Sequence, residues 1–138
     1  MSRQRIQNLA LLLIAVFMLP VGAQSAFAPK SFFDDFPLGR GWIAKEGGAY
    51  NEHLVRDVGV LFLAMVIVTA WTALRSRPGR PIAIAWLVQG VLHVVYHAGH
   101  LDGYKAVDKI GMIGSLTVIP VLALVALWAG WSRPKATG

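Results

Sequence analysis

The chain has 138 residues, which is room for one domain. Apolar residues make up 56% of it, charged residues only 14%, and the mean hydropathy is +0.57. Because soluble proteins carry roughly a quarter charged residues, this composition excludes an ordinary soluble protein. The chain contains no cysteine, which excludes disulfides, thiolate metal sites and cysteine redox chemistry.

Four apolar stretches account for this composition, and each approaches or exceeds the ~20 residues that a transmembrane helix needs. They carry almost no polar face, whereas a surface helix in a soluble protein carries one. We therefore predict an all-α fold, with a single polytopic membrane domain over residues 1–138 built as an antiparallel up-and-down bundle of four transmembrane helices. The predicted helices cover about residues 6–28, 53–74, 81–99 and 108–131.

The first stretch also has features of a signal peptide, because Arg3 and Arg5 precede an apolar run that ends in small residues at 26–28. Cleavage there would leave Pro29 at the first mature position, where processing is disfavoured. The apolar run is also longer than the core of an ordinary signal peptide. We therefore expect a retained first helix.

Residues 29–52, between the first two predicted helices, alternate aromatic residues with charged residues, glycine and proline. This pattern predicts an outer loop that lies on the membrane surface or folds over the helix ends as a cap. The other connections are short, which favours antiparallel neighbouring helices. At the start of the fourth helix, Asp108 is predicted to be the N-cap residue.

Basic residues are distributed unevenly between the two ends of the predicted helices. All seven acidic residues lie at one end, mixed with the remaining cations. The positive-inside rule therefore predicts a multi-pass protein of the bacterial inner (plasma) membrane with both termini in the cytoplasm. No nucleic-acid-binding module is visible, so the net charge of +6 indicates contact with anionic lipid and not with nucleic acid. The cations at the end without acidic residues are Arg3, Arg5, Arg75, Arg77, Arg80, Arg133 and Lys135.

A polar cluster of Glu52, His53, Arg56 and Asp57 opens the second stretch. Glu52 and Arg56 are four residues apart and can pair along the helix. Charged residues inside a membrane are costly and usually face the bundle interior. Asp57 is therefore expected to face the third helix, with His97 as its partner; a structural bond that locks two helices is the alternative.

The third stretch carries His93, His97 and His100 at spacings of four and three residues, which places them on one helical face. Counted at about 1.5 Å per residue from the cytoplasmic boundary, the three histidines lie about 20–30 Å up. Asp57 on the second helix and Ser115 on the fourth fall in the same layer near the outer surface. Helices of one small bundle would bring several of these groups together.

Several kinds of site fit this layer. A divalent transition metal is one, with an open coordination position. Haem ranks below a bare metal ion, because paired histidines at equal depth on facing helices are lacking. A proton path along the histidines, or histidines that only hydrogen-bond their neighbours, are further interpretations. The metal-ligand candidates are His93, His97, His100 and Asp57, and the ligand-binding candidates are Glu52, His53, Arg56, Asp57, Tyr96 and Ser115.

The motifs YNEHLVRDVG at residues 50–59 and HVVYHAGHL at residues 93–101 carry a family resemblance. From about Phe36 onward the chain resembles a group of small, uncharacterised bacterial four-helix integral membrane proteins. More loosely, its layout is similar to DoxX-like four-helix proteins, some of which are associated with sulfur or quinone redox systems. The resemblance implies the bundle and the outer polar cluster, and it assigns no reaction and no catalytic residue.

Two classes of function follow from these observations. In the first, the outer cluster binds a metal ion or a small lipid-like or quinone-like ligand. In the second, the protein is a non-catalytic accessory subunit of a larger membrane complex, or a homo-oligomer, and the cluster locks helices together. The first predicts a cavity lined by the cluster, and the second predicts cluster residues bonded to one another.

The predicted orientation can be tested with single cysteines introduced at Ser76 and Gly47 in the cysteine-free chain. We expect a membrane-impermeant thiol reagent added to intact cells to label the cysteine at position 47 and not the one at position 76, because the unopposed cations stay in the cytoplasm. Labelling of position 76 from outside would contradict the predicted orientation.

Overall fold

The computed structural model describes residues 1–131, and these contain helices and no strand. The predicted all-α fold is confirmed, and the four long helices begin and end within three residues of the predicted stretches. All four are long and apolar enough to cross a membrane, so the protein is a multi-pass membrane protein. Arg133 and Lys135 lie outside the described residues. The helices are α1 (Arg3–Phe27), α2 (Pro29–Asp35), α3 (Trp42–Lys45), α4 (Glu52–Leu74), α5 (Arg80–Ala98) and α6 (Ala106–Ala129).

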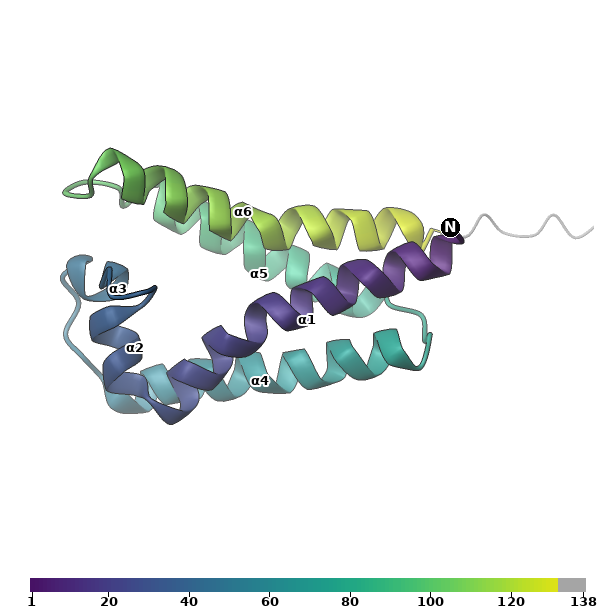
Figure 1. The fold of residues 1–138 in the computed structure, drawn as a ribbon, viewed down its shortest axis with the longest axis horizontal. Coiled ribbons are helices and arrows are strands. Elements are labelled where there is room, and N and C mark those ends of the chain that lie inside the picture. Colours follow the sequence, from purple (N-terminus) through teal and green to yellow (C-terminus); the bar gives the residue numbers. More distant parts are fainter. Residues whose placement is uncertain (132–138) are drawn as a thin grey trace, which may run out of the picture.

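The long helices form two antiparallel pairs, with α1 packed along α4 and α5 packed along α6. We call the end with the N-terminus and the α4–α5 turn the terminal end, and the opposite end the cap end. At the terminal end α1 contacts α6 and the two pairs converge, whereas towards the cap end they separate (Figure 1). The short helices α2 and α3 lie between the separated ends.

Gln7 holds the terminal end together. Its side chain is buried, its Nε2 donates to the carbonyl of Ala126 at 3.0 Å, and its Oε1 accepts from the backbone N–H of Gly79 at 3.3 Å. A Cβ added at Gly130 would lie only 2.0 Å from the Gln7 Nε2. Glycine at this position therefore leaves room for an amide that joins α1, α6 and the α4–α5 turn.

Further along the bundle, Trp86 of α5 contacts α4. Its ring is fully buried, stacks on Phe62 with the centroids 6.3 Å apart, and donates from Nε1 to the hydroxyl of Thr69 at 2.8 Å. One turn further along the same face of α5, a Cβ added at Gly90 would lie 2.7 Å from Pro120 Cδ. This glycine lets α5 and α6 approach closely, as small residues do in membrane helix pairs.

Small residues also determine how closely α1 and α4 pack. A Cβ added at Gly59 would lie 2.3 Å from the backbone nitrogen of Ala26, so only glycine fits there. Beside it, the Ser25 hydroxyl donates to the carbonyl of Val55 at 2.6 Å. Because these contacts continue to the cap end, α1 and α4 remain paired where they separate from α5 and α6.

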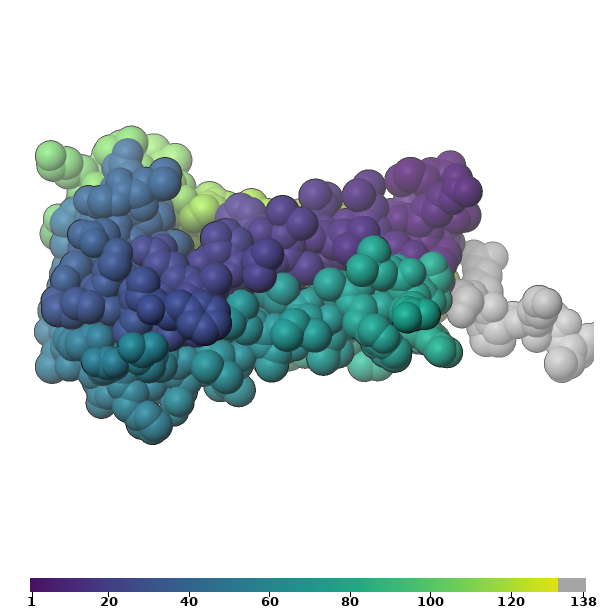
Figure 2. Space-filling view, turned by 60° about the horizontal axis from the view of Figure 1, so that its bottom comes forward, coloured from purple at the N-terminus to yellow at the C-terminus, as the bar shows by residue number. Residues whose placement is uncertain are grey.

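Residues 28–51, which we call the cap, fold across the separated helix ends (Figure 2). This is the second of the two arrangements expected for the loop, and its two short helices were not predicted. Gly41, at the start of α3, has a φ of 59°, and a Cβ there would lie 2.5 Å from the carbonyl oxygen of Asp34. Asn51 ends the cap by accepting the N–H of Leu54 at 3.1 Å, which caps α4.

Candidate functional site

Asp108 joins the cap to the α5–α6 pair. The prediction that Asp108 is an N-cap is wrong, because α6 begins at Ala106 and Asp108 lies in its first turn. There its Oδ1 accepts from Arg40 Nη1 at 2.6 Å and from Trp42 Nε1 at 3.0 Å. The Asp108 side chain is only 8% exposed, so both donors bond a carboxylate that is nearly out of contact with solvent.

Tyr104, in the α5–α6 turn, makes a second bond to the cap by donating its hydroxyl to the carbonyl of Trp42. Burial raises the pKa of the Tyr104 phenol, and the negative charges of Glu46 and Asp108 raise it further. The hydroxyl therefore keeps its proton at neutral pH and remains a donor.

A third contact joins Glu46, just after α3, to His97 of α5. The Nδ1 of His97 lies 2.7 Å from the Oε1 of Glu46, and the side chains are only 13% and 17% exposed. Both atoms are buried, yet neither has an aligned hydrogen bond among the described residues. The two groups are close enough for an ion pair when the imidazole is protonated, and both keep unused hydrogen-bonding capacity.

His93 and His97 continue the face of α5 that packs into the bundle. Ala83, Trp86 and Gly90 precede them on this face at alternating spacings of three and four residues, and all three are buried. His93 is exposed, because the helix pairs have begun to separate at its level. Its ring meets the ring of His97 edge-on, with the two ring centroids 4.6 Å apart. Two imidazoles thus lie on the bundle-facing side of α5, at the level where apolar side chains no longer cover this side.

The α4 cluster lies on a different face. Asp57 is 57% exposed and pairs with His53 on its own helix at 3.3 Å, so the expected bond to His97 is absent and Glu46 takes that position. The buried face of α4 runs through Gly59 and Val66, and two residues of helix rotate Asp57 about 200° away from Gly59. Because Asp57 is five residues inside a helix that starts at Glu52, it lies about 8 Å from the helix end and reaches water.

Arg56 and Glu52 form the expected pair at 2.9 Å, and Arg56 also donates to the carbonyl of Ala26 at 2.7 Å. This second bond connects α4 to the end of α1 and is structural. Both side chains are about half exposed. Neither is drawn into a shared site with the histidines of α5.

The remaining predicted site residues are Tyr96 and His100, at the end of α5, and Ser115 of α6. His100 stacks on Tyr96 with the centroids 4.2 Å apart, and its Nδ1 lies 2.7 Å from the Tyr96 carbonyl oxygen, so both belong to the end of α5. Ser115 is half-buried on the α6 face that also buries Met112 and Ile119, and its hydroxyl donates to the Met112 carbonyl.

The expected metal ligands are not assembled. Among residues 1–131, no three His, Asp or Glu side chains converge as ligands of one ion would. The physical reason is the helix rotation: His93 and His97 face the bundle, His100 is bonded to its own helix end, and Asp57 is on the far side of α4.

The cap residues Arg40, Trp42 and Glu46 were missed as site residues. They lie in or beside α3, whose four residues are too few for a helical period to indicate which side chains point inward. The one available signal was composition, because the segment mixes aromatic residues with both signs of charge.

Comparison with protein-family models, curated proteins and solved structures finds no match to this chain. The resemblance to small bacterial four-helix membrane proteins therefore remains an expectation from the two sequence motifs, and the looser similarity to DoxX-like proteins an expectation from the layout.

We predict that Asp108→Asn loosens the cap, because Arg40 loses its charged partner. A charge-assisted bond of this partly exposed kind contributes about 1–2 kcal/mol, so hydrogen exchange of cap amides at residues 36–46 should quicken by about 5–30-fold. The measurement is hydrogen–deuterium exchange on the detergent-purified protein.

Asp102→Asn is the matched control, since it removes an exposed carboxylate from the same α5–α6 turn. Equal protection of the cap in wild type and Asp108→Asn would show that the Arg40–Asp108 pair does not hold it.

Proposed function

We propose that this membrane protein binds a small amphiphilic ligand, of the lipid-like or quinone-like class, at the cap end between its two helix pairs. His93 and His97 provide the polar contacts, and the cap faces outward as the charge distribution predicts. The observation that carries the proposal is the Glu46–His97 pair, in which two buried polar atoms lie 2.7 Å apart and neither has an aligned hydrogen bond. These two atoms face each other, and no hydrogen bond of the described residues uses the other ring nitrogen of His97, Nε2, which is therefore left for a further partner.

The surroundings suit a molecule with one polar end. Below the imidazoles, the Trp86–Phe62 stack fills the bundle interior, about 10 Å along the axis from His93. Above them lie Glu46 and the cap. Between these limits the backbones of the two helix pairs diverge (Figure 1).

An organic ligand fits better than a metal ion. A carbonyl or hydroxyl oxygen needs only one or two donors, which imidazole N–H groups supply. A transition metal needs at least three converging ligands, and the described residues offer no such group.

The accessory-subunit function is the second candidate, and two sets of bonds favour it. Arg56 links Glu52 to the Ala26 carbonyl, and Asp108 links Arg40 to Trp42, so much of the polar content is used to join segments. A Cβ added at exposed Gly114 of α6 meets nothing within 4 Å, which leaves a place for close approach of a partner helix.

The experiment is native mass spectrometry of the detergent-purified full chain titrated with a short-chain ubiquinone analogue and, separately, with a phosphatidylcholine. We expect one of these to bind, and His97→Ala to weaken that binding about tenfold or more, because a hydrogen bond inside the bundle is lost. His53→Ala is the control, since His53 is 88% exposed and pairs with Asp57 on the other side of α4.

The accessory function predicts a different result. Neither probe would then distinguish wild type from His97→Ala, while His97→Ala would lower the melting temperature. That outcome would contradict the binding proposal.

A further inference from the structure

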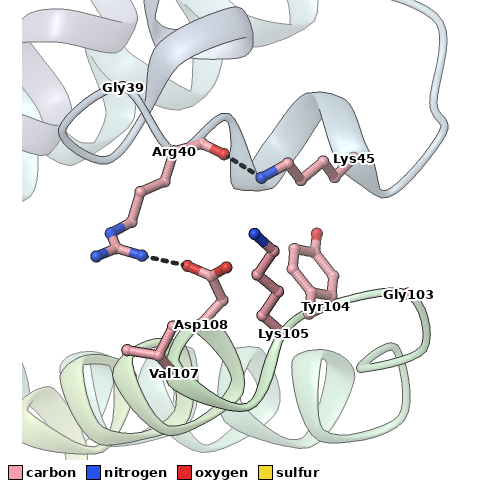
Figure 3. Close-up of a pocket in the computed structure, with 8 residues that line it drawn as sticks. All are labelled: Gly39, Arg40, Lys45, Gly103, Tyr104, Lys105, Val107 and Asp108. Atoms are coloured by element: carbon pink, nitrogen blue, oxygen red, sulfur yellow. Dashed lines mark hydrogen bonds and ion pairs between the residues drawn. The ribbon is translucent and has the colours of Figure 1, made fainter.

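A hollow lies on the surface of the cap end, between the cap and the α5–α6 turn, and it is separate from the proposed ligand site. It encloses about 410 Å³. Figure 3 shows the cap on one side of it and the start of α6 on the other. The polar side chains on its walls are those of Arg40, Lys45, Tyr104, Lys105 and Asp108.

The charges on these walls are unbalanced. Three of the lining residues are cations and one is an anion, and that anion, Asp108, is already bonded to Arg40 at 2.6 Å. Lys45 donates to the Arg40 carbonyl at 2.6 Å, so its ammonium group is held at the edge of the hollow. The Lys105 side chain extends from the opposite wall towards the same space (Figure 3). Because Asp108 is the one acidic side chain on these walls against three cations, the lining carries a net charge of +2.

The backbone adds to this positive potential. Lys105 is the N-cap residue of α6, but its side chain makes no hydrogen bond to the backbone of the first turn. This 24-residue helix therefore begins beside the hollow with no side-chain cap. Asp108 in the first turn offsets part of the positive charge at this helix end. The backbone N–H groups of Ala106 and Val107 make no hydrogen bond with the described residues and are donors for a further anion. Cations from two segments distant in sequence and a helix start therefore surround one space.

We propose that this hollow binds a phosphate group. Two ammonium groups, the unused N–H groups of the Arg40 guanidinium and the uncapped helix start are donors that match a phosphate with several oxygens. The group belongs either to the headgroup of an anionic phospholipid or to a free phosphate-bearing solute, since the chemistry of recognition is the same. The location, at the first turn of a helix long and apolar enough to span a membrane, suits both sources.

The test compares wild type with Lys105→Gln, which removes one cation and leaves the Arg40–Asp108 and Trp42–Asp108 bonds in place. Lys30→Gln is the matched control, because it removes the same charge from an exposed pair elsewhere in the cap. Each detergent-purified full chain is titrated with inorganic phosphate by calorimetry, and with phosphatidylglycerol and phosphatidylcholine by native mass spectrometry.

We expect Lys105→Gln to weaken binding of the phosphate probe about tenfold and Lys30→Gln to leave it unchanged, because one charge-assisted contact is lost. Binding of inorganic phosphate indicates a free solute. Preference for phosphatidylglycerol over phosphatidylcholine, without binding of inorganic phosphate, indicates a lipid headgroup.

Two results would overturn the proposal. One is wild-type protein that binds neither inorganic phosphate nor phosphatidylglycerol more tightly than Lys105→Gln does. The other is an equal loss of binding in Lys30→Gln, which would indicate general attraction to a basic surface. Neither result bears on His97, so failure here is distinct from failure of the proposed function.

Discussion

The buried amide of Gln7 fixes the geometry on which the rest of the structure depends. It bonds Ala126 of α6 and Gly79 of the α4–α5 turn, and glycines at positions 79 and 130 leave the room that it needs. An unsatisfied amide in this setting would be costly, so the contacts are made together or not at all. The two helix pairs are thereby held at one end.

Separation at the other end follows from two different kinds of packing. Within each pair, glycine against backbone or proline keeps the helices close along their length, as at Gly59 and Gly90. Between the pairs, Trp86 of α5 makes a large contact with Phe62 and Thr69 of α4. Beyond it the cap covers the space. The cap contacts the α5–α6 pair at Asp108, Tyr104 and His97. Polar groups gather at this end because the cap and the α5–α6 pair both contribute them.

The sequence predicts the four helices well, because apolar length and the absence of a polar face leave few alternatives. It places the three α5 histidines on one face, and the structure shows that His93 and His97 continue the spacing of Trp86 and Gly90 whereas His100 bonds the end of its own helix. Asp57 was expected to face the third helix because of its depth alone. Its rotation about the α4 axis relative to Gly59 places it instead on the exposed side of α4. Glu46, the actual partner of His97, comes from a segment without periodicity, and no spacing rule connects residues so far apart in the chain.

The convergence of the helix pairs at one end and their separation at the other is tested most directly by distances between spin labels. The cysteine-free chain allows labelled cysteine pairs at exposed positions of α4 and α5, with Leu74 and Ile84 at the terminal end and Leu54 and Val95 at the cap end. Double electron–electron resonance in lipid nanodiscs should give a clearly longer distance for the cap-end pair than for the terminal-end pair. Equal distances at the two ends would mean that α4 and α5 run side by side, and would contradict this account of the cap and of the site beneath it.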